Sequence, residues 1–278
     1  MTVTVVPVPP VAAPPLGPGA SLSASLEVVE HISRNQVLDV YDAWSRERDC
    51  RCVVKLLRPD SRGVDRRERR LRYEGELLMR LRHPHLVSAY ELVDEPQTMI
   101  VLETLTGLTL DALLEDLPRR LPLHDVLGLG VQLCSAVGYL HRQGVLHLDV
   151  KPGNIVCPET GQIKLIDLSL ARPPGRVRAG LGTRGYRPPE QEEGGVVSPA
   201  ADVWAIGAVL FEAAAGRPYS ESRGDLRSVR RVPAAFAHAL AACLDPEPLA
   251  RPDIAGLADA LDDLLPTDLQ RRSRRFCA

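Results

Sequence analysis

The sequence has no run of apolar residues long enough to span a membrane. Its longest apolar stretches, Ile163 to Leu170 and Val203 to Ala215, are interrupted by Asp167 and Glu212. Both fall short of the roughly 18 to 20 residues that a spanning helix needs. The first 20 residues also lack the basic start and apolar core of a secretory signal. We therefore expect a cytoplasmic protein with no membrane-spanning segment.

No charge of one sign prevails either. The 34 Lys and Arg residues nearly balance the 36 Asp and Glu residues, which gives a formal net charge of -2 over 278 residues. Such a balance provides no overall attraction to nucleic acid or to anionic lipid. We expect no nucleic-acid partner, and any charged partner must be recognised by a local group of side chains.

The spacing of cysteines that would indicate a zinc site or a redox motif is absent. The six cysteines, at positions 50, 52, 134, 157, 243 and 277, form no Cys-x-x-Cys pair and have no nearby pair of histidines. Buried, reduced thiols are the expected state in the cytosol. No internal repeat of roughly 20 to 50 residues is visible, which argues against solenoids and propellers.

The apolar pattern changes from strand-like to helical along the chain. Apolar runs separated by polar turns predict about five strands and one helix, at 65–82, within the first hundred residues. Beyond Gly107 helical patterns occur at 108–114, 126–141, 203–215, 234–243 and 254–265, with one β-like patch at 145–170. A strand-rich part followed by a helix-rich part predicts an α+β protein with two lobes and a cleft between them.

These shifts also suggest the domain boundaries. Six prolines within the first 20 residues predict a flexible, extended arm at 1–21. One folded domain is expected at 22–268, with a smaller lobe at about 22–103 and a larger one at about 107–268. The last ten residues, 269–278, form a basic tail with four arginines.

Two charged residues in the strand-rich part stand among apolar ones. Glu74 lies three residues after Leu71 and four before Leu78, so helical spacing points its carboxylate into the apolar stripe. Lys55 follows the apolar run 52–54 on an expected strand. Either residue alone could extend its charge to water. Because a buried carboxylate needs a cationic partner, the two together predict an ion pair between strand and helix.

The β-like patch holds most of the polar chemistry. Asp149, Lys151, Asn154 and Asp167 lie among Val, Ile and Leu residues, which is costly unless these groups hold one another, a metal or a ligand. Two carboxylates and one amide supply the hard oxygen ligands that Mg²⁺ prefers.

At this point the sequence resembles the eukaryotic-type serine/threonine protein kinases, and its composition favours a bacterial member. The resemblance covers 26–265 and rests on motifs in the family's order: Cys-Val-Val-Lys ending at Lys55, His147 to Asn154, Asp167-Leu168-Ser169, Gly182 to Glu190 and Asp202-Val203-Trp204. It implies a bilobal protein-kinase-like fold, with a small β-rich N-lobe containing one main helix and a larger α-rich C-lobe. It also implies transfer of the ATP γ-phosphate to a protein Ser or Thr hydroxyl, with Mg²⁺ or Mn²⁺.

The resemblance assigns catalytic roles to single residues. Asp149 would accept or orient the substrate hydroxyl proton, and Lys151 would balance charge at the γ-phosphate. Asn154 and Asp167 would hold the metal ion. In the same way Asp202 would anchor the catalytic loop and Arg251 would pair with Glu190.

The nucleotide contacts follow from the same resemblance. Lys55 would hold the α and β phosphates, with Glu74 as its helix partner. Adenine would lie between Val40 and Val53 on one side and Val156 on the other. Leu102 would stand at the back of the pocket, and the backbone of Glu103 to Leu105 would offer hydrogen bonds.

Three departures from the family pattern affect the expected function. Ser33, Asn35 and Leu38 stand where the phosphate-covering loop has glycines, which predicts weaker or altered nucleotide affinity. Leu168 and Ser169 replace Phe and Gly beside the magnesium aspartate. Leu148 replaces an Arg that binds an activation-segment phosphate in many relatives, so activation through that pocket is not expected.

Three functions stay open on the sequence. An active kinase with a protein substrate and a regulatory protein partner is favoured, because the aspartates that perform the reaction are present. A pseudokinase, a nucleotide-binding or scaffolding module with little or no transfer, is suggested by the missing glycines. A small-molecule kinase of the aminoglycoside phosphotransferase type shares the fold, but the segment 182–190 argues against it because that element serves polypeptide substrates.

Overall fold

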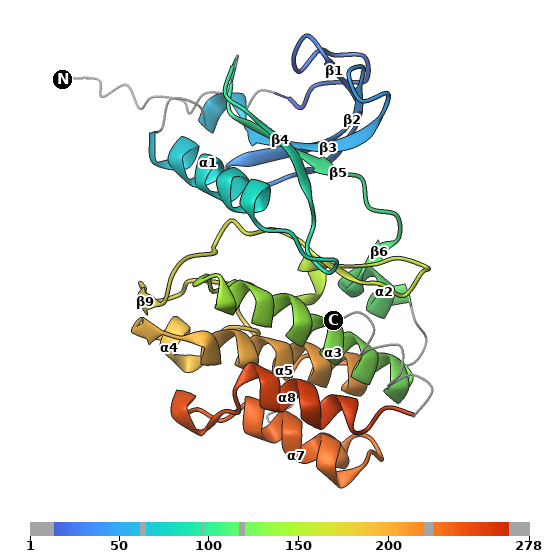
Figure 1. Cartoon of the computed structure of the whole chain (residues 1–278), viewed down its shortest axis with the longest axis vertical. Helices are drawn as coiled ribbons and strands as arrows, with labels where there is room; N and C mark the ends of the chain where they lie inside the picture. Colours follow the sequence, from blue (N-terminus) through green and yellow to red (C-terminus); the bar gives the residue numbers. More distant parts are fainter. Residues whose placement is uncertain (1–13, 62–64, 96, 117–119, 220–224, 267–278) are drawn as a thin grey trace, which may run out of the picture. The chain divides into compact units, whose positions relative to one another are not determined.

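The structure is a computed structural model that describes residues 14–61, 65–95, 97–116, 120–219 and 225–266 (Figure 1). Most of the expected proline-rich arm, residues 1–13, and the whole basic tail at 269–278 lie outside the described residues. The described chain divides into two compact units. The first runs up to Arg80 and adds Ala89–Thr104, and the second contains Leu81–Ser88 and the chain from Leu105 onward.

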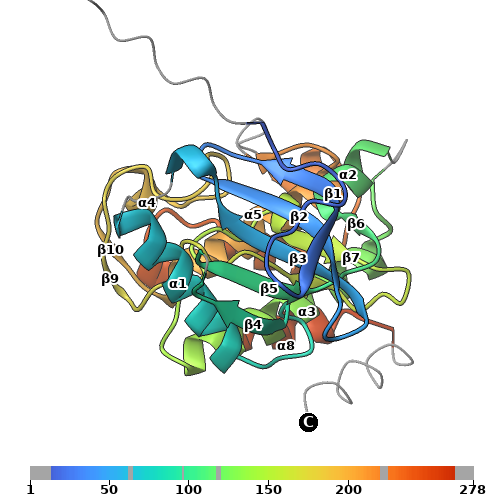
Figure 2. The ribbon, with the colours of Figure 1, turned by 90° about the horizontal axis from the view of Figure 1, so that it is seen from above.

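The first unit is built on one antiparallel sheet with a helix beside it (Figure 2). The five strands follow the order β1-β2-β3-β5-β4. Their bounds are Leu26–Arg34 for β1, Leu38–Ser45 for β2, Cys50–Leu57 for β3, Ala89–Val93 for β4 and Met99–Glu103 for β5. Helix α1 covers Asp65–Arg80 and buries its apolar stripe, as the sequence predicts.

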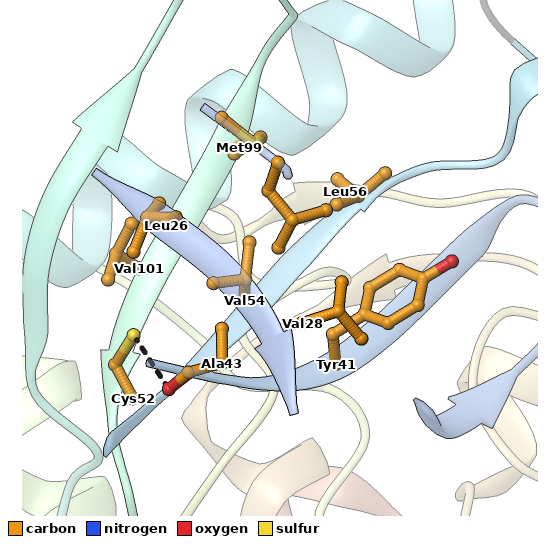
Figure 3. Close-up of a cluster of buried hydrophobic side chains, with 10 residues drawn as sticks. Leu26, Val28, Tyr41, Ala43, Cys52, Val54, Leu56, Met99 and Val101 are labelled. Carbon is orange, nitrogen blue, oxygen red and sulfur yellow. Dashed lines mark hydrogen bonds between the residues drawn. The ribbon is translucent and has the colours of Figure 1, made fainter. Parts of the chain in front are cut away.

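Alternate residues of the strands divide the sheet into two faces. One face carries a closed apolar core (Figure 3), made of Leu22, Leu26, Val28, Tyr41, Ala43, Cys52, Val54, Leu56, Met99 and Val101. The residues between these positions face the other side, and they include Val40, Val53, Lys55 and Leu102. The side chains with an expected nucleotide role therefore lie on the face opposite this core.

Ordered structure begins before the expected boundary at residue 22. The Gly19 amide donates to the Val28 carbonyl at 2.8 Å, and the Val28 amide donates to the Ala20 carbonyl at 2.8 Å. The Leu16 amide donates to the Tyr41 hydroxyl at 3.0 Å. Residues 16–20 thus satisfy polar groups along the edge strand β1 and on the neighbouring strand β2.

The second unit is mainly helical (Figure 1). Its main helices, α3, α5, α8 and α7, are stacked in the view of Figure 1. The helices are α2 (Leu110–Asp116), α3 (Leu123–Arg142), α4 (Pro189–Glu192), α5 (Pro199–Ala215), α7 (Ala234–Cys243) and α8 (Ile254–Asp262). The short strands are β6 (Leu108–Thr109), β7 (Ile155–Cys157), β8 (Lys164–Leu165), β9 (Gly175–Arg176) and β10 (Val196–Val197).

Helix α3 is the one described helix long and apolar enough, by length and composition, to cross a membrane. Most of its apolar window is buried inside the protein. Leu133, Ala136, Val137 and Leu140 are fully covered by the rest of the unit. This burial is typical of the core helix of a globular domain.

The connection between α1 and β4 differs from the expected continuous N-lobe. The Leu165 amide donates to the His85 carbonyl at 2.8 Å, and the Val87 amide donates to the Leu165 carbonyl at 3.0 Å. Residues 81–88 therefore belong to the second unit, and the chain joins the sheet of the first unit only from Ala89 onward. An apolar pattern predicts a strand but does not name its pairing partner.

Candidate active site

The predicted ion pair between strand and helix is present in the first unit. Lys55 Nζ on β3 lies 2.8 Å from Glu74 Oε1 on α1, and the two side chains are 10% and 2% exposed. The neighbouring Gly75 lets α1 pack closely against β4 and β5, since a Cβ there would lie 2.6 Å from Leu92 Cδ1 and 3.3 Å from Ile100 Cγ1. Two charges removed from water are tolerated only when they compensate each other, so each residue depends on the other.

Three apolar residues of the expected adenine site share the sheet face of Lys55. Val40 pairs with Lys55 across β2 and β3, and Val53 pairs with Leu102 across β3 and β5. All three apolar side chains are only partly buried. Glu103 follows as the last residue of β5. The first unit thus presents an open apolar surface beside a buried lysine.

The hairpin between β1 and β2 is closed by side chains instead of glycines. Asn35 Oδ1 accepts hydrogen bonds from the amides of Val37 and Leu38, both at 2.8 Å. The Asn35 amide donates to the Leu38 carbonyl at 3.0 Å. Asparagine side chains stabilise such turns by replacing a backbone acceptor. Asn35, which stands at one of the three positions where the family has glycine, therefore stabilises this turn.

A cluster of polar side chains around the buried Asp39 holds the base of this hairpin. Arg34 donates to both carboxylate oxygens of Asp39, at 2.7 and 2.9 Å, and His31 Nε2 lies 3.1 Å from Oδ1. Burial by itself raises the pKa of Asp39, but the hydrogen bonds from Arg34 and His31 outweigh it and hold that pKa below its ordinary value. Asp39 therefore stays ionised and clamps β1 to β2.

The catalytic-loop residues of the second unit form one hydrogen-bonded network. Asp149 Oδ1 accepts from the Thr183 amide at 2.9 Å and from its hydroxyl at 2.7 Å. Lys151 Nζ lies 3.0 Å from Asp149 Oδ2 and donates to Thr183 Oγ1 at 2.9 Å. Asn154 Nδ2 donates to Asp149 Oδ2 at 3.2 Å and to its carbonyl at 2.9 Å. Lys151, Asn154 and Thr183 thus hold both oxygens of one carboxylate.

Asp167 lies in the loop that follows β8. The Ile166 amide donates to the Asn154 carbonyl at 2.9 Å, which brings this loop beside the catalytic loop. Asp167 has a φ of 67° and its Oδ1 accepts from the Ser169 amide at 3.0 Å. A left-handed conformation in a residue other than glycine is uncommon and concentrates at functional sites. The expected metal residues Asn154 and Asp167 therefore belong to adjacent backbone segments.

Asp202 on α5 anchors the catalytic loop. Its fully buried carboxylate accepts from the amides of His147 at 2.9 Å and Leu148 at 2.8 Å, and His141 Nε2 lies 2.9 Å from Oδ2. Burial by itself raises the pKa of Asp202, but the His141 contact, the charges of His141 and His147 and the Leu148 amide hold it below the ordinary value. The carboxylate thus provides hydrogen-bond acceptors for two backbone amides that would otherwise be buried without a partner.

The end of the activation segment is fixed by the predicted pair of Glu190 and Arg251. Arg251 donates to both Glu190 oxygens, at 2.7 and 2.9 Å, and its side chain is fully buried. Bidentate pairing of this kind specifies orientation as well as position. Gln191 reinforces the arrangement by donating to the Leu148 carbonyl at 3.0 Å.

Leu148 lies in an apolar environment. It belongs to a buried cluster with Leu146, Val177, Val197 and Ala201. Hydrophobic packing thus links the catalytic loop to the activation segment here. The remaining expected adenine residues, Leu105 and Val156, also lie in the second unit, and Val156 is buried on β7.

Thr183 is not among the catalytic residues that the sequence predicts. The Gly-Thr pair at 182–183 is part of the family resemblance, but the hydrophobic pattern gives no reason to place Thr183 beside Asp149. Gly182 has a φ of 88°, and a Cβ there would lie 2.8 Å from the Leu148 carbonyl oxygen. Only glycine allows this approach, and it delivers the next residue, Thr183, to the carboxylate.

Comparison with known proteins identifies the family. A family model described as a protein kinase domain matches residues 26–273. The serine/threonine-protein kinase PrkC of Bacillus subtilis is 32% identical over 207 residues, which cover 72% of this chain and 32% of PrkC. The serine/threonine-protein kinase PknA of Mycobacterium tuberculosis is 30% identical over 214 residues, which cover 73% of this chain and 49% of PknA.

The chain thus spans about a third of the length of PrkC and about half of the length of PknA. Among solved structures, the kinase domain of Mycobacterium tuberculosis PknI matches with a TM-score of 0.75 and 26% sequence identity. That match covers 90% of this chain and 99% of the PknI domain. The fold is therefore the α+β protein-kinase fold, and the chain belongs to the protein kinase family.

Proposed function

We propose that this chain is a serine/threonine protein kinase that transfers the γ-phosphate of ATP to a protein hydroxyl. The observation that carries the proposal is the network in which Lys151, Asn154 and Thr183 hold the carboxylate of Asp149. A packed core gives no reason to gather a carboxylate, an ammonium group, an amide and a hydroxyl at one place. Phosphoryl transfer gives such a reason, because the reaction depends on positioning of the reactants and on charge neutralisation.

Asp149 is assigned as the group that accepts or orients the substrate hydroxyl proton. Its side chain is 10% exposed, so the carboxylate is accessible although three residues hold it. Thr183 fixes Oδ1 through two hydrogen bonds. Lys151, 3.0 Å from Oδ2, is assigned to balance the charge that collects near the transferred phosphoryl group.

A protein kinase domain uses ATP and a divalent metal ion. Asn154 directs its Nδ2 to Asp149, which leaves its amide oxygen as an acceptor, and Asp167 adds a carboxylate from the adjacent segment. This oxygen-only set suits Mg²⁺ or Mn²⁺. We assign Asn154 and Asp167 as the residues that would hold the ion, which when bound would neutralise phosphate charge.

Nucleotide contacts are assigned in each unit separately. In the first unit, Lys55 would bind phosphate oxygens with its charge oriented by Glu74, and Val40, Val53 and Leu102 would contact adenine. Glu103 would offer backbone hydrogen bonds. In the second unit, Leu105 would offer backbone hydrogen bonds and Val156 would contact adenine. The partly buried state of Val40, Val53 and Leu102 supports this assignment, since a purely structural core would cover them.

The direct test is phosphate transfer from γ-labelled ATP, with Mg²⁺ or Mn²⁺, to a generic protein substrate. Phosphoserine or phosphothreonine in the acid hydrolysate is expected, and phosphotyrosine is not. Nucleotide binding without transfer would instead favour a pseudokinase. A cytoplasmic location and a regulatory protein partner are further parts of this proposal.

A further inference from the structure

The activation segment carries an excess of positive charge. From Leu168 to Pro189 the sequence contains no Asp or Glu, but it contains arginines at positions 172, 176, 178, 184 and 187. The whole chain has a net charge of -2, so this concentration is local. Charge gathered on one segment creates a field that selects partners of opposite sign.

Two of the five arginines have a structural role. Arg172 Nε donates to the Leu170 carbonyl at 3.1 Å. Arg187 donates to the Gly180 and Gly182 carbonyls at 2.7 and 3.1 Å and forms an ion pair with Glu192. These two arginines stabilise the segment itself and are therefore not available to a partner.

The other three arginines are directed to solvent. Arg176, Arg178 and Arg184 are exposed, and none forms an ion pair with a described residue. Val177 is buried between the first two, so the alternation of an extended chain turns both guanidinium groups outward. We call these three residues the arginine surface.

Nearby acidic side chains do not neutralise the arginine surface. Glu190 is paired with Arg251, and Glu192 is paired with Arg187, although Arg184 also helps to lower the pKa of Glu192. Glu212 accepts a hydrogen bond from the Tyr186 hydroxyl at 2.6 Å. Asp202 is buried beneath the catalytic loop. Among the described acidic residues of this region, only Glu193, which follows α4, stands exposed without such a partner, so a positive excess remains.

The backbone that carries the arginine surface is held firmly. Strand β9 pairs with β10 through Val196 opposite Arg176, and the Val177 amide donates to the Gly195 carbonyl at 2.8 Å. The Gly180 amide donates to the Gln191 carbonyl at 2.9 Å. The charges are therefore presented on an ordered support, which reduces the entropy lost when a partner binds.

Arg184 is adjacent to the reacting group. It follows Thr183, whose amide and hydroxyl both bind Asp149 Oδ1, and neighbouring Cα atoms are about 3.8 Å apart. A substrate hydroxyl that reaches Asp149 therefore brings its flanking residues close to Arg184. Arg176 and Arg178 lie further back along the same segment and are suited to more distant substrate residues.

We propose that the arginine surface selects protein substrates whose phosphorylated Ser or Thr is flanked by Asp or Glu residues. The inference rests on the proposed kinase function and specifies its substrate class. Acidic side chains would pair with Arg184 close to the acceptor and with Arg176 and Arg178 further away. Basic residues at the same places would be repelled.

The test compares three peptides of equal length that share one serine and differ only in flanking Glu, Gln or Lys residues. We expect kcat/KM for the Glu peptide to exceed that for the Gln peptide by about five- to tenfold, the sum of two exposed ion pairs. The Lys peptide should be poorest. The difference should narrow at high salt, because exposed pairs are screened.

Variants locate the effect on the protein. Arg184→Glu should remove or reverse the preference for the Glu peptide, and Arg184→Lys should retain most of it. Arg227→Glu makes the same charge change at an exposed position of the helical turn Leu226–Ser228 and should leave the preference unchanged. Equal rates for all three peptides, or a preference for Lys, would overturn the inference.

A binding measurement separates this inference from the proposed function. Fluorescence anisotropy with peptides that carry Ala in place of Ser reports charge preference without catalysis. Preferential binding of the Glu peptide without phosphate transfer would support the arginine surface and contradict the kinase function. If neither transfer nor binding depends on peptide charge, the proposed role of the arginine surface is contradicted and the proposed kinase function is not.

Discussion

At the scale of single residues, the geometry of Asp149 depends on the hydroxyl of Thr183. That hydroxyl donates to Asp149 Oδ1 at 2.7 Å and accepts from Lys151 Nζ at 2.9 Å, so it joins the carboxylate to the ammonium group. Removing this hydroxyl takes one hydrogen bond from each charged group, while the Thr183 amide, Asn154 and the ion pair with Lys151 still hold the carboxylate. Thr183 thus acts as a positioning residue through its two partners.

Replacing Thr183 tests this role. Thr183→Val keeps the shape and loses the hydroxyl, and we expect kcat to fall about ten- to a hundredfold, the equivalent of about 1.5–3 kcal/mol for a hydrogen bond to a charged group. Thr183→Ser should recover most of the rate. Steady-state kinetics of both variants measures kcat. An unchanged kcat in Thr183→Val would contradict the positioning role of Thr183.

Lys55 and Glu74 allow stability to be separated from activity. Lys55→Met leaves the buried Glu74 without its 2.8 Å partner, and we expect a loss of about 3–5 kcal/mol in the free energy of unfolding, measured by urea denaturation. The double variant Lys55→Met, Glu74→Leu should regain most of that stability. It should still lack phosphate transfer, because the proposed phosphate contact is gone.

Recovery of transfer in the double variant would show that Lys55 serves only to compensate Glu74. An unchanged stability in the single variant would mean that the carboxylate finds another partner. The two readouts therefore test the structural and the chemical assignments of Lys55 independently.

At the scale of elements, the β1–β2 hairpin departs most from the expected kinase pattern. Asn35 closes the turn and Asp39 clamps its base, so the loop is fixed by side chains. A glycine-rich loop would instead be free to move its backbone toward phosphates. The hairpin thus gains rigidity and loses that freedom.

Introducing glycines should increase the backbone freedom of the hairpin and reduce its rigidity. We expect Ser33→Gly with Asn35→Gly to lower the KM for ATP and also to lower the unfolding free energy by about 1 kcal/mol, the cost of added backbone freedom. Asn35→Ala is the control, since it removes the turn acceptor without adding glycine. An unchanged KM in the double glycine variant would mean that the loop does not contact the phosphates.

The sequence was most informative about elements whose own pattern decides their structure. The periodic stripe of α1 and the misplaced charges at 55 and 74 predicted both the helix and its ion pair, because burial of an isolated charge is too costly to persist. The pairing of Glu190 with Arg251 and the anchoring by Asp202 came from the family resemblance, and the structure contains both contacts.

The sequence was least informative where partners lie far apart along the chain. Residues 81–88 were expected in the N-lobe, but their backbone bonds to residues around 165 assign them to the second unit. The pairing of residues 16–20 with the edge strand was missed for the same reason. Backbone hydrogen bonding leaves no trace in side-chain pattern, so neither could be foreseen.

At the scale of the whole molecule, Asp202 couples folding to pH. Its pKa is held below the ordinary value of 3.8, so the ionised carboxylate stabilises the folded state above that pH. This contribution is lost as pH falls through the lowered pKa, because the unfolded chain takes up the proton first.

We therefore expect Asp202→Asn to be less stable than the wild type at neutral pH but to lose less further stability on acidification. Thermal unfolding followed between about pH 6 and pH 3 measures both slopes. Equal slopes would show that other groups dominate acid unfolding. Activity at neutral pH should fall in this variant as well, since His147 and Leu148 lose a charged acceptor.

Asp149 is the residue around which the helical unit gathers its polar side chains. The catalytic loop, the Asp167 loop and the activation segment all belong to that unit, and Lys55 belongs to the β-rich unit. Asp149 is the one residue assigned to accept or orient the proton of the substrate hydroxyl. Its replacement therefore addresses the central claim without disturbing the proposed nucleotide contacts.

The deciding measurement is single-turnover transfer from γ-labelled ATP by the wild type, Asp149→Asn and the surface control Asp263→Asn. We predict transfer by the wild type and by Asp263→Asn, and a loss of about 10²- to 10⁴-fold in Asp149→Asn, the contribution of a positioned proton acceptor. Nucleotide binding by thermal shift should be retained in all three proteins. Transfer at the full rate by Asp149→Asn, or no transfer by the wild type, would contradict the account.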